Sequence, residues 1–222
     1  MLFRPYFIHE ILEALFYLAP MSLQPFLDHL NQFLALNEQE KEFLMQAVGL
    51  REFSKGSIIL KTKEISQSFY FNLKGCVRLY YEIEGEEKTA FFYTENQFIS
   101  SYESFTRQLP SRHSLQCIED SQLVEIGMEA AAKLLAFSPK FEALARIMME
   151  EELIIYQDII SSFITLKPEE RYLKLSEENP GLLQRIPQYH LATYLGITPE
   201  SLSRIKKRRM EKDFLNKSQG DT

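Results

Sequence analysis

The sequence of 222 residues predicts a mixed α+β fold, in which a layered set of short strands precedes a long helix and a small helical domain. Three observations predict it. Six short runs rich in β-branched and aromatic residues lie between residues 57 and 126, a helical apolar pattern covers 141–163, and a helix-turn-helix pattern covers 188–205. We therefore expect domains at 22–138, 139–164 and 165–222, preceded by an apolar extension at 1–21.

Residues 1–21 are apolar, although polar and charged residues interrupt them: Arg4, His9, Glu10 and Glu13. No uninterrupted run is long enough to span a bilayer, and no signal-peptide pattern follows. Met21 offers an alternative start, so this segment is open to being a mis-assigned extension. If it is translated, we expect a helix packed on the body. Between Ser22 and Gly49 the apolar spacing is also helical.

The strand region begins near Arg51, where the apolar period shortens. Turn signals such as Lys55-Gly56 and Glu84-Gly85 separate the runs. Several short strands at close spacing favour a barrel or a double-layered roll. The expected strands are Ser57–Leu60, Phe69–Phe71, Cys76–Tyr81, Thr89–Tyr93, Ser114–Ile118 and Gln122–Ile126.

The long helix predicted at 139–164 carries two apolar stripes. One face follows Phe141, Ala145, Met148, Glu152, Ile155, Ile159 and Phe163, six of the seven apolar. The other stripe is marked by Ile147, Ile154 and Ile160. A helix that is apolar on two sides has more to bury than one face of a β-roll requires. An identical helix across a two-fold axis explains the excess best, and we expect Met148, Ile155 and Ile159 at that interface. The alternative is packing against the protein's own N-terminal helices.

The segment Gln188–Ile205 has the pattern of a helix-turn-helix. Apolar residues occupy the sites where two crossed helices meet: Leu191, Leu195, Ile197, Leu202 and Ile205. Ala192 is small where the helices approach closely, and Gly196 suits a left-handed turn. Thr198 is placed to cap the second helix, and Pro199 suits its first turn. The alternative is a helical hairpin inside a larger core.

The second helix then has an outward face with the chemistry of a recognition helix. Such helices place their N-terminal residues against base edges in the major groove, where a guanidinium reads guanine and a hydroxyl donates or accepts. Glu200 suits a cytosine amino group or the positive end of the helix. Six basic residues against one acid in Arg204–Lys212 favour phosphate contact. The residues we assign to DNA contact are Gln188, Thr198, Glu200, Ser201, Arg204, Lys207 and Arg208.

The distribution of charged residues also changes near Thr165. The whole chain has 25 Lys and Arg against 31 Asp and Glu, a net charge of −6. From Thr165 onward 11 basic and 8 acidic residues give +3, which leaves 14 basic and 23 acidic residues, or −9, in the remainder. A small DNA-binding domain attached to a larger regulatory one fits this distribution. Two cysteines, Cys76 and Cys117, are too few for a disulfide framework and favour a reduced, cytoplasmic compartment.

Enzyme and metal signatures are absent from the sequence. It has no glycine-rich phosphate loop, no GxSxG and no HExxH, and its four histidines have no metal or haem spacing. We expect no catalysis, no cofactor and no metal. The competing hypothesis to DNA binding is a protein-interaction or signalling module whose degenerate sensor domain has no specific DNA target.

The chain resembles the CRP/FNR family of bacterial transcription regulators over about Leu23 to Arg209. The resemblance rests on Lys55–Leu60, Phe69–Gly75, the long helix, Glu169-Glu170-Arg171, and Ile186–Ala192 through Arg204-Ile205. It implies a double-stranded, jelly-roll-like β-roll of the cyclic-nucleotide-binding type with flanking helices. It also implies a dimerisation helix and a small C-terminal winged helix-turn-helix that binds palindromic promoters, with RNA polymerase as a further partner. Asp213–Lys217 is short for a full wing and is expected to give only an abbreviated strand.

Departures from the family pattern concentrate in the nucleotide pocket. Nucleotide-binding members carry a Gly-Glu pair and an Arg-Ser or Arg-Thr pair there. This chain lacks the first, and Ser111 stands at the position of the arginine unless Arg112 slips by one residue. Lys63 also replaces a hairpin glycine. We expect little or no binding of cyclic AMP, and an effector, if one exists, of another kind. The residues we assign to such a pocket are Ser100, Ser101, Glu103, Ser111 and Arg112.

Overall fold

The computed structural model describes residues 22–220 and the side chains of residues 22–211. The N-terminal extension and the prediction made for it lie outside the described residues. Two helices, α2 (Gln24–Phe33) and α3 (Glu38–Ala47), replace the single helical pattern expected from Ser22 to Gly49. The break has a local cause, because Asn37 accepts the backbone N–H of Glu40 while the Glu40 carboxylate accepts that of Asn37, which begins a new helix.

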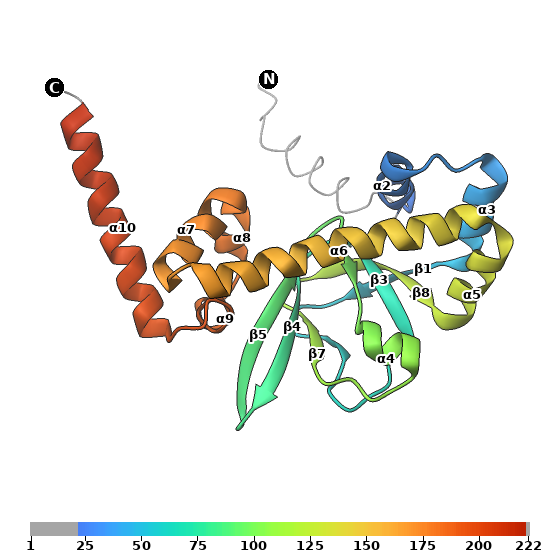
Figure 1. Cartoon of the computed structure of the whole chain (residues 1–222), viewed down its shortest axis with the longest axis horizontal. Helices are drawn as coiled ribbons and strands as arrows, with labels where there is room; N and C mark the ends of the chain where they lie inside the picture. The colour runs from blue at the N-terminus through green and yellow to red at the C-terminus, as the bar shows by residue number, and fades with distance from the viewer. Residues whose placement is uncertain (1–21, 221–222) are drawn as a thin grey trace, which may run out of the picture.

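Two antiparallel sheets of four strands follow, as the sequence predicts (Figure 1). One sheet has the order β1-β8-β3-β6 and the other the order β2-β7-β4-β5. The strands are β1 (Gly49–Phe53), β2 (Ile58–Leu60), β3 (Ser68–Lys74), β4 (Val77–Ile83), β5 (Glu86–Tyr93), β6 (Phe98–Ile99), β7 (Ser114–Cys117) and β8 (Ser121–Gly127).

Two of these strands, β1 and β6, were not predicted. β1 is mostly exposed and β6 has two residues, so neither shows a long alternating pattern. Both gain their stability from pairing with strands distant in the sequence, β1 with β8 and β6 with β3. Pairing with a distant strand leaves no pattern in the strand's own local sequence.

The two faces of the first sheet contribute to different cores. Residues such as Val77, Tyr93, Ile99 and Leu123 fill the space between the sheets. Phe71, Val124 and Ile126 point the other way and pack against α2, α3 and the helices that follow the roll. The alternation of side chains along a strand produces this division.

Three helices complete the part of the chain that contains the β-roll. The short α4 (Tyr102–Arg107) lies between β6 and β7, and α5 (Met128–Phe137) follows β8. α6 (Pro139–Thr165) then crosses the whole roll and leads to the C-terminal helices (Figure 1). Ser138 begins it by accepting the backbone N–H of Lys140, and Pro139 occupies the first turn.

The C-terminal region is helical throughout its described part. It contains α7 (Pro168–Glu178), α8 (Pro180–Arg185), α9 (Gln188–Tyr194) and α10 (Pro199–Gly220). The expected abbreviated strand at Asp213–Lys217 is wrong, because α10 continues through those residues. The segment Pro199–Lys217 contains no glycine and no internal proline to stop the helix.

No helix in the described part of the chain combines the length and the hydropathy that a membrane crossing requires.

Candidate functional site

The helix-turn-helix has the internal packing that the sequence predicts. Leu191, Leu195 and Leu202 are almost wholly buried where α9 meets α10. Gly196 forms the turn at φ +70°, and the Thr198 hydroxyl accepts the backbone N–H of Ser201 at 3.3 Å. A left-handed turn followed by a capped helix fixes the angle between α9 and α10, so the pair presents α10 outward.

Arg171 on α7 ties the end of α6 to this turn. Its guanidinium donates to the carbonyl of Leu166, at 2.8 Å, and to that of Leu195, at 2.7 Å. The same group lies over the ring of Phe163 at 4.4 Å. Because a planar guanidinium offers several fixed donors, one side chain holds the long helix and the helix-turn-helix together.

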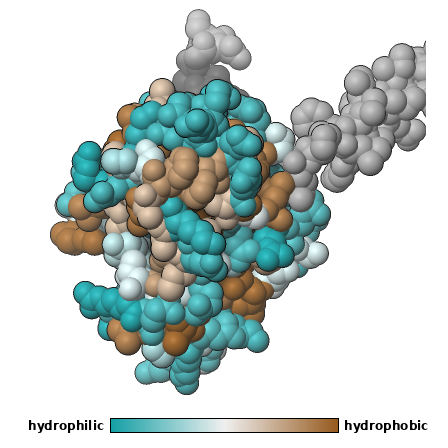
Figure 2. Space-filling view, turned by 90° about the vertical axis from the view of Figure 1, so that its right-hand side faces the viewer, coloured by the Kyte–Doolittle hydropathy of each residue, from teal (hydrophilic) through white to brown (hydrophobic). Residues whose placement is uncertain are grey.

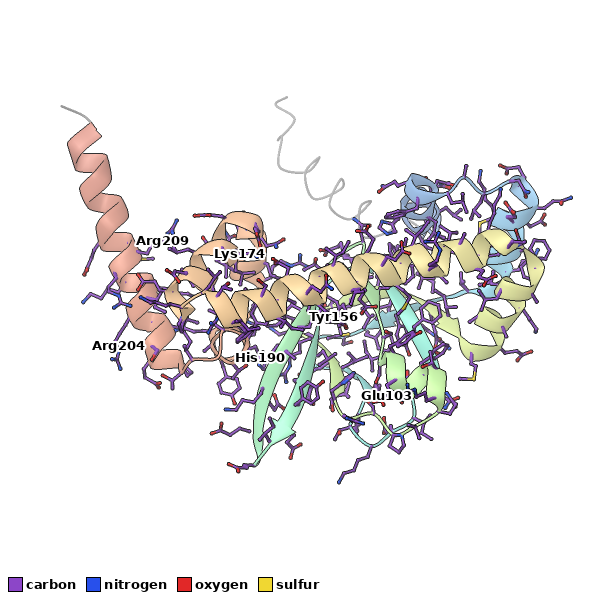
Figure 3. The ribbon with its side chains drawn as sticks, viewed as in Figure 1. Glu103, Tyr156, Lys174, His190, Arg204 and Arg209 are labelled. Atoms are coloured by element: carbon purple, nitrogen blue, oxygen red, sulfur yellow. The ribbon has the colours of Figure 1, made fainter. Side chains whose placement is uncertain are left out.

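The outward face of α10 carries positive charge. Arg204 and Lys207 are exposed, and neither makes a side-chain hydrogen bond or ion pair with the residues that the structure describes. Arg208 is also exposed but pairs with Glu169 of α7 at 3.0 Å. Figure 3 shows Arg204 directed away from the body of the protein, at the outer side of α10.

The remaining predicted contacts lie at the start of α10. The Glu200 carboxylate is held by its own backbone N–H and by the Thr198 hydroxyl, which lower its pKa. The hydroxyl oxygens of Thr198 and Ser201 lie 3.2 Å apart. Gln188 reaches across from α9 to the carbonyl of Pro199 at 3.4 Å. Gln188, Thr198, Glu200 and Ser201 therefore lie together at the start of α10, while Lys207 and Arg208 lie further along it.

The back of this domain packs on the β-roll, which the sequence did not reveal. Phe92 of β5 contacts Tyr194 of α9, with ring centroids 5.2 Å apart, and the backbone N–H of Thr89 donates to the Thr193 hydroxyl at 3.3 Å. Cys76, Phe92 and Ile118 belong to the same apolar cluster as the helix-turn-helix core. The body of the protein thus holds α9, and α10 projects beyond it (Figure 1).

A buried guanidinium lies at the centre of that contact. Arg78 on β4 is 2% exposed and is held by Glu87 and Gln116. A third partner comes from the other domain, because Nη1 of Arg78 lies 3.0 Å from Nδ1 of His190 on α9 (Figure 3). Arginine has no acceptor, so this nitrogen of His190 accepts and the ring is neutral. Burial, and then the Arg78 charge, lower the pKa of His190.

A second polar contact lies at the end of α8. Arg185 donates to Glu95 at 2.7 Å and also pairs with Glu119, both from the β-roll. Sequence patterns gave no signal for Arg78 or Arg185, since each looks like an ordinary polar residue in its own segment. Their partners are 9 to 112 positions away and become neighbours only in the folded chain.

The predicted effector residues divide into two groups. Ser101 and Ser111 are buried and their hydroxyls lie 3.0 Å apart. Ser111 also donates to the carbonyl of His113, and its own carbonyl accepts the N–H of Lys63. Lys63 adopts φ +72°, the left-handed conformation for which the family uses glycine. The hydroxyl groups of Ser101 and Ser111 are therefore already engaged in hydrogen bonds within the protein.

Glu103, Arg112 and Ser100 lie elsewhere. Arg112 is strongly exposed and pairs with Glu103 on α4 at 3.4 Å, so its guanidinium does not point at Ser111. Ser100 lines a separate apolar cavity beneath α6. The folded chain thus brings Ser101 to Ser111 and Glu103 to Arg112 as two separate pairs. Among the described residues, no fixed cation lies beside the serine pair to hold a phosphate.

Comparison with known proteins agrees with this architecture. The family model for the cyclic nucleotide-binding domain matches residues 50–137. No curated protein matches the sequence closely enough to count as a relative. Among solved structures, CLP, the c-di-GMP-responsive global regulator of Xanthomonas campestris, has a TM-score of 0.66 at 14% identity, over 80% of this chain and 93% of its own. The chain has the CRP/FNR fold.

Two further structures have the same CRP/FNR fold. FixK2 from Bradyrhizobium japonicum gives a TM-score of 0.64 at 16% identity, covering 75% of this chain and 86% of that one. The catabolite activator protein of Thermus thermophilus gives 0.50 at 20% identity, covering 83% and 88%. At these identities the likeness establishes the architecture, and the chemistry of the site has to be argued from this chain's own residues.

The long helix of this CRP/FNR fold exposes a different stripe from the one expected to form the dimer. Ile155 and Ile159 pack against the core between the sheets of their own protomer, and Met148 lines the cavity beneath α6. The exposed apolar side chains are Met149, Leu153, Ile154, Ile160, Phe163 and Ile164. The sequence predicted two stripes but could not tell which one the β-roll covers, and it grouped Phe163 with Ile155 although Phe163 is exposed.

Proposed function

We propose that this protein is a cytoplasmic, homodimeric transcription regulator that binds a palindromic DNA site through α10. One observation carries the proposal. The exposed face of α10 holds Arg204 and Lys207 without a side-chain hydrogen bond or ion pair in the described residues, while the opposite face is packed against α9. Unpaired cations on a projecting helix suit phosphates and base edges better than they suit an apolar partner.

Position along α10 separates base reading from phosphate contact. Arg204 lies one turn into the helix, where a recognition helix meets base edges. Lys207 lies one turn further on, towards the backbone that flanks the groove. Arg208 must leave Glu169 to reach a phosphate, so its contribution is expected to be smaller than that of Lys207.

Selection of bound sequences from random DNA by the purified protein tests the proposal, and a palindromic consensus is expected. On that consensus, Arg204→Ala should cost about 1–3 kcal/mol and relax the preference at one position of each half-site. Lys207→Ala should weaken specific and scrambled duplexes alike and reduce the salt dependence by about one unit of slope. Lys61→Ala, an exposed site on the β-roll, is the control and should change neither quantity.

Two results would count against this function. Selection without any enriched sequence from a folded protein would favour the protein-interaction hypothesis. Equal weakening of both duplexes by Arg204→Ala, with the base preference intact, would make Arg204 a phosphate contact and place the reading face elsewhere.

We also infer that the β-roll does not bind cyclic AMP. Support comes from the mutual hydrogen bond of Ser101 and Ser111 and from the outward position of Arg112. A cyclic phosphate needs a fixed guanidinium and nearby N–H groups. Isothermal titration calorimetry is expected to show no binding of cyclic AMP at micromolar concentrations. Micromolar affinity that is lost in Arg112→Ala would show that Arg112 turns inward.

A further inference from the structure

An apolar cavity of about 310 Å³ lies beneath the first half of α6. Helices α2, α3, α4, α5 and α6 surround it, and the outer face of the sheet containing β3 and β8 closes it. Its walls include Phe26, Phe69, Phe98, Ile126, Leu134 and Phe141. A volume near 300 Å³ with mainly apolar walls and a few polar groups is typical of a small-molecule site.

This cavity is separate from the pocket that the nucleotide-binding resemblance implies. Phe69 and Ile126 line it, whereas Tyr70 and Leu123 point to the opposite side, between the sheets. The buried Ser101 and Ser111 do not line it either. Figure 2 shows the end of the molecule formed by α3 and α5, where apolar side chains gather between hydrophilic ones.

The cavity has one acidic group, Glu152 of α6. Its Oε1 accepts the Tyr156 hydroxyl at 2.8 Å, and that hydroxyl lies 3.1 Å from the hydroxyl of Tyr93, which is buried between the sheets. Burial raises the pKa of Glu152. The nearby polar groups come from Ser100, Tyr102 and Thr106, and the Thr106 hydroxyl already donates to the carbonyl of Tyr102.

We propose that this cavity binds a small uncharged molecule with an aromatic or aliphatic body and one N–H or O–H group that donates to Glu152. The apolar walls bury the body of the ligand, and Glu152 supplies a directed acceptor. A carboxylate or phosphate is disfavoured, because it would enter a water-poor site next to another acid and meets no cation among the lining residues.

The position of the cavity gives the ligand a route to the DNA-binding domain. It lies under the helix that continues to Phe163, and Arg171 joins that end of α6 to the helix-turn-helix. The chain of hydroxyls from Glu152 to Tyr93 also links the cavity to the core between the sheets. Control of DNA affinity by the ligand rests on the proposed function, whereas ligand binding itself does not.

Binding is tested on the full chain without DNA, using N-phenyl-1-naphthylamine, an uncharged aromatic probe with one N–H. Saturable fluorescence enhancement at one probe per protomer is expected. Ala131→Phe fills the cavity from α5 and should weaken binding of the probe about tenfold or more. Ala136→Phe, on the exposed side of the same helix, is the matched control and should bind as the original chain does.

Competition between the probe and two other ligands tests the role of Glu152. Because it is measured on the unchanged protein, it does not depend on whether a variant folds. Decanol should displace the probe at a concentration about tenfold lower than decanoate, and Glu152→Gln should narrow that difference. Equal displacement by the alcohol and the acid would overturn the role of Glu152.

Three other outcomes would overturn the site itself. They are the absence of saturable binding, equal binding by the Ala131→Phe and Ala136→Phe variants, and a fall in bound probe per protomer as protein concentration rises. The last would show that a second copy of the chain covers the cavity. Because these measurements contain no DNA, and the DNA selection contains no probe, failure of either proposal is recognised independently of the other.

Discussion

At the scale of single residues, glycines show how closely the chain approaches itself. Gly85, Gly196 and Gly75 all have positive φ angles, which side chains adopt only at a cost. Their surroundings differ. A Cβ on Gly85 would meet nothing within 4 Å, on Gly196 it would lie 3.3 Å from Phe163, and on Gly75 it would come within 2.4 Å of Ser121 Oγ and 2.7 Å of its Cα.

The destabilisation caused by alanine at these three glycines should therefore increase as the space for a Cβ decreases. Gly85→Ala should lower the free energy of unfolding by about 1–2 kcal/mol from backbone strain alone. Gly196→Ala should cost somewhat more, and Gly75→Ala most, because its contacts are with backbone atoms of Ser121. Urea denaturation measures all three. A smaller loss for Gly75→Ala than for Gly85→Ala would show that the β3–β4 turn relaxes.

At the scale of elements, α6 decides how two protomers could meet. Met149, Leu153, Ile160 and Ile164 are spaced by four and seven residues, so they share one exposed face of the helix. Ile164 is 79% exposed, an unusual position for a large aliphatic side chain. This exposed face replaces Met148, Ile155 and Ile159 as the surface we propose for dimerisation.

Charge placed on that face should separate the protomers. The double change Leu153→Asp and Ile160→Asp should give folded monomers in sedimentation velocity, because two carboxylates would be buried against an apolar partner. Ser161→Asp, also exposed on α6 but off the stripe, is the control and should stay dimeric. Ile155→Asp should instead destabilise the protomer, since Ile155 packs on the core of its own β-roll. A double variant that remains dimeric would place the interface on another surface.

At the scale of the whole molecule, the β-roll and the C-terminal helices behave as one packed unit in this structure. Their shared apolar cluster is flanked by Arg78 with His190 on one side and Arg185 with Glu95 and Glu119 on the other. The orientation of α10 therefore depends on the contacts of α9 and α8 with the β-roll. Anything that changes those contacts is expected to change where α10 projects.

Acid should weaken this packing. Burial lowers the pKa of His29, His113 and His190 below 6.5, and Arg78 lowers that of His190 further. At these histidines the unfolded chain then binds more protons than the folded one, so they lower the free energy of unfolding as pH falls from 7 towards 5. The raised pKa of Glu152 acts in the opposite direction. The lowered pKa values of Glu95 and Glu125 affect the free energy of unfolding only below pH 4.5, the ordinary pKa of a glutamate.

Replacing His190 isolates its share of this dependence. His190→Gln keeps an acceptor for Arg78 but does not titrate, so its unfolding free energy should fall less steeply between pH 7 and 5. His190 faces Arg78 and the nearby Glu87 of the β-roll and the ring of Tyr189 on its own helix. Urea denaturation at three pH values measures the slopes. An unchanged slope would mean that His190 keeps its ordinary pKa in the folded protein.

The sequence by itself determined the features whose signal is local. Six of the eight strands follow from apolar runs between turn residues, and the helix-turn-helix follows from the spacing of Leu191, Leu195, Gly196 and Leu202. These signals survive because alternation, helical period and a left-handed glycine each depend on a few neighbouring residues. DNA contact by Arg204 and its neighbours remains a prediction.

Tertiary structure decided everything that depends on distant partners. Only packing shows that the Ile155 stripe of α6 covers the β-roll and the Ile160 stripe does not, since both are apolar at the same period. Only packing joins Arg78 to His190, 112 positions apart, and encloses the cavity beside Glu152 with residues from five helices and a sheet. A side chain's own sequence neighbours fix its local conformation, but which surface meets which is set by burial of apolar area over the whole chain.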